Sequence, residues 1–218
     1  GIASEVGIVE KINGERAQIQ RLFKNLAQRN ITGYYVPSLR EARAKIMELL
    51  PDFCTVGIGN SKTLKDMKIT AVLLEKGYTV LDKTLADSKE DAVTLKKQAL
   101  LTDWYICGCN AISMDGHLVN MDHSGNRVAA MVFGPDKVII VAGINKVVSD
   151  LEDAIRRVRN HAAPLNAIRA GMNPPCVQTG KCVDCRHPER VCCNLLITEG
   201  QADPHRMTVI IVGEERGF

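Results

Sequence analysis

The segment 137–143 constrains the fold more strongly than any other part of the sequence. It reads Lys-Val-Ile-Ile-Val-Ala-Gly, with five consecutive apolar residues. A strand that exposes one face to water alternates apolar and polar residues, whereas a continuous apolar run is typical of a strand buried on both faces, as in parallel sheets. The sequence therefore predicts a buried strand here, in a sheet covered on both faces.

Shorter apolar segments predict further strands, and helical patterns separate them. Strands are expected at 34–36, 55–58, 78–81, 104–107, 194–197 and 207–212. Helices are expected at 5–28, from Ser38 to Pro51, over 71–76, from Ser88 to Leu101, and from Ser149 to about Ala162, where Pro164 ends the last one. The apolar face of the first helix consists of Ile8, Ile12, Ile19, Leu22, Phe23 and Leu26. This alternation predicts an open, mostly parallel, doubly wound α/β sheet, which binds ligands at the carboxyl ends of its strands.

A change in composition near Gly171 divides the chain. Strands and helices alternate before this point, and Pro, Gly and Cys replace the helical patterns after it. We expect an α/β domain at 1–170, in which 1–36 is a largely helical N-terminal extension. Residues 171–218 are then a Cys-rich loop with two terminal strands, packed on the same domain.

Composition argues against nucleic acid and membranes as partners. The 28 Lys and Arg residues exceed the 25 Asp and Glu residues by only three, and aromatic residues make up 4% of the chain. Such a chain lacks the positive surface that attracts phosphates and the aromatic side chains on which bases stack. Its apolar runs are far shorter than the roughly 20 residues that cross a bilayer. The N-terminus shows no basic region followed by an apolar core, so we expect a cytoplasmic protein.

The turn after the expected strand 55–58 is the first candidate site. It reads Gly-Ile-Gly-Asn-Ser-Lys-Thr-Leu over 57–64. Glycines allow close approach of the backbone to a ligand, and free amides at a helix start favour an anion. We therefore predict a phosphate or carboxylate site made of Gly57, Gly59, Asn60, Ser61 and Thr63. The turn is neither a Walker-type nucleotide loop nor a full dinucleotide fingerprint, and a tight turn with Ser61 as helix cap is the alternative.

The segment 109–127 is the second candidate site, a polar stretch between two strands that we expect to be irregular. Its Asp-Gly pair at 115–116 is also a strong hairpin signal. The anion-binding candidates here are Asn110, Asn120, Asn126 and Arg127. Arg127 is expected to pair bidentately with a second anionic group of the ligand. Asp115 or Asp122 is expected to act as a general acid or base if the protein is a catalyst.

Five of the eight cysteines lie between residues 176 and 193. In a chain without an export signal such clustering indicates metal or redox chemistry rather than disulfides. We predict that Cys176, Cys182, Cys185 and Cys192 hold either zinc or an iron–sulfur cluster, since soft thiolates exclude Mg²⁺ and Ca²⁺. Cys193 or His187 is a substitute ligand, and a loop of buried free thiols is the alternative.

In these motifs the sequence resembles the LUD (lactate-utilisation) domain family. The turn 59–64 looks like the family's Gly-Gly-Ser-x-Thr-Leu pattern, with Asn60 in place of the second glycine. The resemblance continues through Asn110-Ala111-Ile112, Asp115-Gly116, Leu118-Val119-Asn120, Asp122 and the segment 125–130. Phe133-Gly134-Pro135, the segment 143–146 and the cysteine motif look like a subgroup with a Cys-rich tail.

The resemblance implies both a fold and a function. The fold is similar to that of ribose-phosphate isomerases, CoA-transferases and folate cyclo-ligases, which bind phosphorylated or carboxylated small molecules, and copies of such proteins often pair into a homodimer. The implied function is oxidation of L-lactate to pyruvate alongside iron–sulfur redox partner proteins. A non-catalytic ligand-binding or assembly subunit with a structural metal is one alternative, and an isomerase, ligase or CoA-transferase-like enzyme is another.

Overall fold

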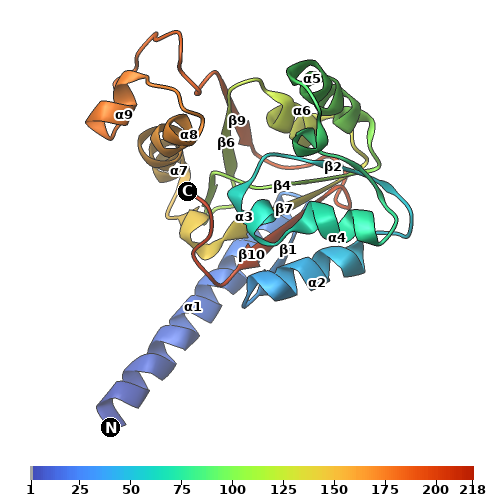
Figure 1. Ribbon diagram of the computed structural model, residues 1–218. Helices are drawn as coiled ribbons and strands as arrows, with labels where there is room; N and C mark the ends of the chain where they lie inside the picture. The colour runs from blue at the N-terminus through green and yellow to red at the C-terminus, as the bar shows by residue number, and fades with distance from the viewer. Residues whose placement is uncertain (1) are drawn as a thin grey trace.

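The computed structural model describes residues 2–218, with side chains for 10–11 and 13–218. Its main sheet has six strands, and every neighbouring pair is parallel. The order across the sheet is β1 (Ile31–Val36), β10 (Met207–Val212), β7 (Lys137–Gly143), β4 (Trp104–Cys107), β2 (Thr55–Ile58) and β3 (Thr79–Leu81). The predicted open parallel sheet is therefore confirmed, and the apolar run of 137–143 is one of its two central strands (Figure 1).

Two apolar cores cover the two faces of this sheet. Along β7, Val138 and Ile140 belong to one core and Ile139 and Val141 to the other, because successive side chains of a strand point to opposite faces. The first core contains α1 (Ile2–Gln28) and α6 (Asn126–Val132), and the second contains α2 (Leu39–Leu49), α3 (Lys62–Asp66) and α4 (Ile69–Glu75).

The expected apolar face of α1 is confirmed in its second half. Leu22 and Leu26 are fully buried, and Ile19 and Phe23 pack against the same core. The side chains of Ile8 and Ile12 lie outside the described residues. No helix in the described part of the chain is long and apolar enough to cross a membrane.

The segment 109–127, expected to be irregular, instead forms two strands of a second sheet. The order there is β8 (Val147–Val148), β5 (Ala111–Ser113), β6 (Leu118–Asp122) and β9 (Asn194–Thr198), with β5 and β6 joined as an antiparallel hairpin. The Asp-Gly turn signal was therefore the better guide to this segment. The strands were not predicted because they contain polar residues such as Ser113 and Asn120, which are typical of loops. In the structure both residues are fully buried, and hydrogen bonds satisfy their side chains.

The helix that begins after residue 150 does not end before Pro164. Asp150 caps α7 (Leu151–Arg157), and a π-helical turn at Val158–Ala162 leads directly into α8 (Ala163–Arg169). Pro164 lies in the first turn of α8, where a missing N–H is tolerated. The short helix α9 (Pro175–Thr179) and the cysteine loop follow, and the chain returns through β9 and β10.

The remaining elements complete the wall above the main sheet. They are α5 (Lys89–Gln98) and three short 3-10 turns at Lys83–Leu85, Ala99–Leu101 and Ile144–Lys146. In Figure 1 α5 and α6 lie on one side of the upper edge of the sheet, and α7, α8 and α9 on the other. The space between these two groups contains the candidate site described next.

Candidate anion-binding cleft and cysteine cluster

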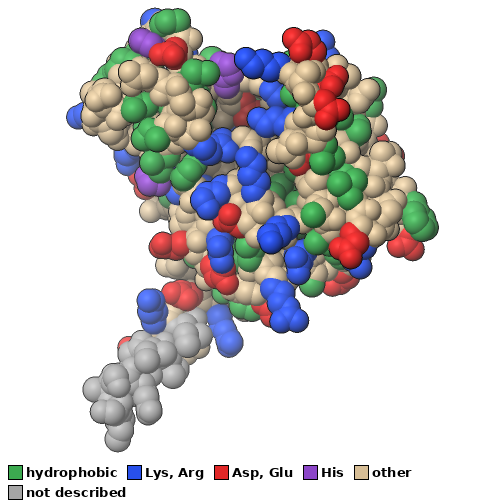
Figure 2. Space-filling model, viewed as in Figure 1, with side chains coloured by type: hydrophobic (Ala, Val, Ile, Leu, Met, Phe, Trp, Pro, Cys, Tyr) green, Lys and Arg blue, Asp and Glu red, His purple; other side chains and the backbone are tan. Residues whose placement is uncertain are grey.

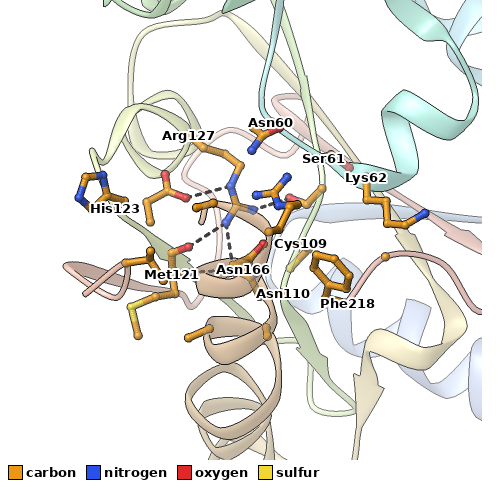
Figure 3. Close-up of a pocket in the computed structure, with 18 of the residues that line it drawn as sticks. Asn60, Ser61, Lys62, Cys109, Asn110, Met121, His123, Arg127, Asn166 and Phe218 are labelled. Carbon is orange, nitrogen blue, oxygen red and sulfur yellow. Dashed lines mark hydrogen bonds and ion pairs between the residues drawn. The ribbon is translucent and has the colours of Figure 1, made fainter. Parts of the chain in front are cut away.

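A cleft of about 250 Å³ lies at the carboxyl ends of the parallel strands. Segments that follow five of these strands line it: 60–63 after β2, Lys83 after β3, 108–110 after β4, Lys146 after β7, and 217–218 after β10. The end of β6, the start of α6 and one face of α8 close the other side (Figure 3). This is the position at which doubly wound sheets bind ligands, as the sequence predicted.

The cleft is strongly basic. Its lining includes Lys62, Lys83, Lys96, Arg127, Lys146 and Arg169. Asp122 is the single carboxylate among the lining side chains of the described residues, and it is paired with Arg127. Figure 2 shows Lys and Arg side chains gathered around the hollow of this face. The cleft therefore carries an unbalanced positive charge, which favours an anionic occupant.

The turn after β2 combines the two roles proposed for it. The Ser61 side chain caps α3 by accepting a hydrogen bond from Leu64 N (3.3 Å), and Ser61 also lines the cleft beside Asn60 and Thr63. The Asn60 Oδ1 atom is buried and has no hydrogen-bond partner in the described part of the chain. A ligand that donates a hydrogen bond would satisfy this atom.

The two glycines of the turn serve packing rather than ligand approach. A Cβ atom at Gly57 would lie 2.8 Å from the Tyr105 ring, and one at Gly59 would lie 2.8 Å from the Cys107 Cβ atom. Both glycines allow β2 to pack closely against the side chains of β4. Neither lines the cleft, so the predicted contact of Gly57 and Gly59 with an anion is not supported.

All N–H groups of the Arg127 guanidinium donate hydrogen bonds to other groups of the protein. Its Nε donates to Asp122 Oδ1 (3.0 Å), and Nη1 donates to Gly108 O (2.9 Å) and Asn120 Oδ1 (2.8 Å). Its Nη2 donates to Asn110 Oδ1 (2.9 Å) and Met121 O (3.2 Å). A guanidinium has five N–H donors, so none is left for the bidentate pairing with a ligand that the sequence suggested. Burial is the largest influence and acts to lower the pKa of Arg127, but the Asp122 carboxylate together with Cys107, Cys109 and Tyr105 outweighs it, so the pKa is raised.

The asparagines near Arg127 have different positions. Asn110 and Asn126 line the cleft, whereas Asn120 is fully buried beneath it and does not. Asn120 Oδ1 accepts from Arg127 and from Asn110 N (3.1 Å). Asn120 is therefore a support of the site and not one of the ligand contacts predicted for it.

Of the two candidate acid–base residues, only one lines the cleft. Asp115 lies in the β5–β6 turn, where it contacts Ser113 and His117 Nδ1 (3.1 Å), and it does not line the cleft. Its catalytic assignment is therefore not supported by its position. Asp122 does line the cleft, and its Oδ2 accepts from Val128 N (2.9 Å) at the start of α6 while Oδ1 binds Arg127. The structure leaves Asp122 as the carboxylate within reach of a ligand.

Two further cysteines lie near the cleft: Cys107 ends β4, and Cys109, two residues later, lines the cleft. Cys107 and Cys109 are both buried in the first core. Burial raises the pKa of Cys107 to about 12 and also raises that of Cys109. Thiols of this kind are protonated at neutral pH and are poor nucleophiles, so both cysteines act as small core residues.

The four predicted metal ligands surround one small cavity of about 20 Å³. Cys176, Cys182, Cys185 and Cys192 all line it, whereas Cys193 and His187 do not. The sulfur of Cys182 accepts from Asp184 N (3.4 Å) and that of Cys192 from Arg190 Nη2 (3.3 Å). No three His, Cys, Asp or Glu side chains among the described residues are placed to hold one metal ion together.

The thiols of this cavity influence one another. Burial raises the pKa of Cys176, and the neighbouring Cys185 and Cys192 raise it further. The cavity also adjoins the basic cleft, because Ala163 and Val191 line both. The cysteine cavity and the candidate anion site are therefore neighbours that share two lining residues.

Comparison with known proteins identifies the family. The profile of the LUD domain matches residues 19–212. The chain belongs to the LUD domain family. A DUF162 family protein from Deinococcus radiodurans shares its fold with a TM-score of 0.54 and 17% identity, over 91% of this chain and 98% of that one.

Other similarities to the LUD domain are partial. A ribose 5-phosphate isomerase A from Neisseria gonorrhoeae aligns with 52% of this chain and 54% of its own, at a TM-score of 0.36 and 19% identity. The eIF2B delta subunit from Chaetomium thermophilum aligns with 54% of this chain and 51% of its own, at a TM-score of 0.35 and 19% identity. No curated protein matches the sequence.

Four basic residues of this LUD domain were missed by sequence reasoning: Lys83, Lys96, Lys146 and Arg169. Lys146 ends the Gly-Ile-Asn-Lys segment directly after β7, so its position at a strand's carboxyl end was a usable signal. Lys83 follows the end of β3 in the same way, whereas Lys96 and Arg169 lie in helices, where Lys and Arg usually form a solvated face. Only the topology brings them to one cleft.

Proposed function

We propose that this LUD domain binds an anionic small molecule, a carboxylate or a phosphate ester, in the basic cleft. We further propose that it takes part in the oxidation of L-lactate to pyruvate together with iron–sulfur partner proteins, the activity that the family name suggests. The observation that carries the proposal is the excess of cations over the single, already paired carboxylate among the lining side chains described above.

In this proposal each group has a separate task. Ser61, Asn60 and Asn110 provide hydroxyl and amide groups on the strand side of the cleft, and Lys83, Lys96 and Arg169 surround it with positive charge. Arg127 fixes the loop ends through its five hydrogen bonds and sets the position of Asp122. Asp122 is the carboxylate that would accept or return a proton, and its ion pair with Arg127 fixes its position at the edge of the cleft.

We propose that Cys176, Cys182, Cys185 and Cys192 hold an iron–sulfur cluster or a zinc ion. Four thiolates are a donor set that suits both, and two of the sulfurs already accept N–H hydrogen bonds of the kind that stabilise thiolate charge. An iron–sulfur cluster would supply electron transfer next to the cleft, and zinc would fix the loop. The shared wall at Ala163 and Val191 favours a role connected with the cleft ligand.

The anion proposal is tested by calorimetric titration with inorganic phosphate and with L-lactate. Lys96 and Lys97 provide a matched pair, because they are neighbours with the same charge in the last turn of α5 and only Lys96 lines the cleft. Lys96→Ala is expected to weaken binding about threefold to tenfold, whereas Lys97→Ala leaves it within twofold. Absence of binding by the wild type, or equal losses in both variants, would place the anion site elsewhere.

The metal proposal is tested by anaerobic purification followed by analysis of iron, zinc and acid-labile sulfide. Cys185→Ser is expected to reduce the metal content well below that of the wild type, whereas Cys54→Ser, which lies in the second core, leaves it unchanged. A brown protein with sulfide indicates the iron–sulfur cluster, and a colourless protein with zinc indicates the structural ion. Neither metal in stoichiometric amount would reject both.

A second candidate function is a ligand-binding subunit without catalysis. It is favoured by the occupation of every Arg127 donor within the protein and by the position of Asp115 outside the cleft, which together leave few free acid–base groups. Turnover of L-lactate with an artificial electron acceptor, in the metal-loaded protein, separates the two functions. Binding without turnover, unless partner proteins are added, supports the subunit.

A further inference from the structure

Arg190 lines the cavity of the four cysteines and joins the two ends of the segment between Cys185 and Cys192. Its Nη1 donates to Cys185 O (3.2 Å), and its Nη2 donates to Cys192 O (2.9 Å). The same Nη2 also donates to Cys192 Sγ (3.3 Å). One guanidinium therefore contacts two of the four predicted metal ligands, and it contacts one of them at the sulfur itself.

One donor of this guanidinium lacks an acceptor. The Arg190 Nε atom is buried and makes no hydrogen bond within the described part of the chain. No carboxylate of the described residues forms an ion pair with Arg190 either. Buried N–H groups in folded proteins almost always have an acceptor, and the cavity that Arg190 lines is bounded by four thiols. The missing acceptor therefore points to an electron-rich group that these sulfurs hold.

The lining of the cysteine cavity carries more positive than negative charge. Arg159 lines it from the π-helical turn, in addition to Arg190. Asp184 is the single carboxylate among the lining side chains of the described residues, and it pairs with the exposed Arg186 (2.9 Å). Four thiolates outweigh the charge of one divalent ion, so a metal bound by them is a net anion that needs cationic partners. The donor set and the two arginines therefore fit an anionic metal–thiolate centre.

We propose that Arg190 is a positioning residue of this metal–thiolate centre. It holds the main chain at Cys185 and Cys192 in place, and its Nε–H would donate to a sulfur of the loaded centre. This inference rests on the proposed metal function of the four cysteines, and it adds a residue outside the ligand set on which their hold on the metal depends. Partners that hydrogen-bond to metal ligands typically change metal affinity by about tenfold to hundredfold.

The first test measures how fast the anaerobically purified chain loses its metal to a chelator. Arg190→Gln removes the charge and most of the donors, so metal release is expected to become about tenfold to hundredfold faster. Arg186→Gln is the matched control. Arg186 lies on the same loop and also donates to Cys185 O (3.2 Å), yet its side chain is 73% exposed and does not line the cavity. Its release rate is expected to stay within twofold of the wild type.

The second test separates an effect on the sulfur from an effect on the loop alone. It records the thiolate-to-metal charge-transfer absorption, either that of the cluster itself or that of Co²⁺ exchanged for zinc. A hydrogen bond from a cation lowers the energy of the sulfur electrons, so its loss in Arg190→Gln is expected to move this absorption to longer wavelength. If circular dichroism shows that Arg190→Gln does not fold, Arg190→Lys takes its place. That variant keeps the charge but loses the planar fork of donors, so a smaller change in the same direction is expected.

The outcomes distinguish the inference from the function on which it rests. Faster metal release together with a displaced absorption in the Arg190 variant, and neither in Arg186→Gln, supports the inference. Unchanged release, faster release with the wild-type absorption, or equal effects in the two variants overturns it and leaves the metal centre itself intact. A wild-type chain that holds no metal in stoichiometric amount rejects the proposed metal function and this inference together.

Discussion

The basic cleft and the cysteine loop are neighbours, yet they are built in different ways. The cleft is bounded by the ends of parallel strands, and its shape is maintained by a buried guanidinium with five hydrogen bonds. The cysteine loop between α9 and β9 contains no strand or helix. Its thiols, with Cys176 of α9, surround a cavity without forming a closed set of metal ligands in the described residues. The cleft is organised before any ligand binds, whereas in our proposal a bound metal would order the loop.

This difference predicts that metal removal affects the loop much more than the cleft. The loop offers trypsin exposed sites at Lys181 and Arg186. Structural metal in a small loop contributes on the order of 10 kcal/mol to its order, so chelation under reducing conditions is expected to accelerate cleavage there by about 100-fold or more. Mass spectrometry of the fragments measures this rate, with phosphate affinity as the control for the cleft. Cleavage at the same rate before and after chelation would show that the loop is ordered without metal.

The cleft, in contrast, is expected to depend on Arg127 for its stability. Arg127→Met leaves Asp122, Asn120 and two carbonyl groups without their donor in a buried setting. Removing one partner of a buried ion pair costs about 3–5 kcal/mol, which urea unfolding measures directly. Arg156→Met is the control, since its exposed pairs with Glu152 and Asp153 contribute at most about 1 kcal/mol. Similar losses in the two variants would mean that the Arg127 network is not the support described above.

Binding in the cleft is also expected to depend on pH through Lys146. The groups that act on its pKa are Arg157, Arg127 and Cys109, and burial together with Arg157 lowers that pKa to about 8. Lys146 is charged below this pH, so affinity for sulfate, which does not titrate in this range, falls by up to about tenfold per pH unit above 8. The native state prefers the neutral amine, so the free protein gains stability between pH 8 and about 10. In Lys146→Arg the positive charge persists above pH 8, so the sulfate affinity is expected to become independent of pH in this range. If the affinity of this variant still fell above pH 8, the pH dependence would belong to another group.

The same comparison explains what the sequence did and did not predict. The bounds of β2, β4, β7 and β10 follow from local apolar runs, and all four were predicted correctly. The Asp-Gly pair at 115–116 signalled the turn between β5 and β6. The two strands themselves were not predicted, because Ser113 and Asn120 look like loop residues, although buried hydrogen bonds satisfy them.

The residues of the two candidate sites also differ in how far the sequence could predict them. The four cysteines are close in sequence, and their spacing indicated a shared centre, which their common cavity still allows. The cations of the cleft come from 3-10 turns and helices far apart in the chain, and only the crossing order of the sheet brings them together. Local patterns reveal local clusters, whereas a site assembled by topology requires the fold.

The smallest effect is expected for a substitution of Asp115, one of the two aspartates that the sequence could not distinguish. Asp115 is half-exposed in a turn, and although its slight burial acts to raise its pKa, hydrogen bonds from Ser113 and His117 outweigh this and lower it. Asp115→Asn is therefore expected to lower the free energy of unfolding by at most about 1 kcal/mol. This loss is expected only at pH values above the titration of the Asp115 carboxyl, because acidification removes the stabilising charge from the wild type as well. The phosphate affinity of Asp115→Asn is expected to stay within twofold of the wild type. Asp122→Asn is expected to reduce the phosphate affinity more, because it removes the carboxylate that pairs with Arg127. A larger loss in Asp115→Asn than in Asp122→Asn would move the working carboxylate from the cleft to the hairpin turn, and with it the ligand.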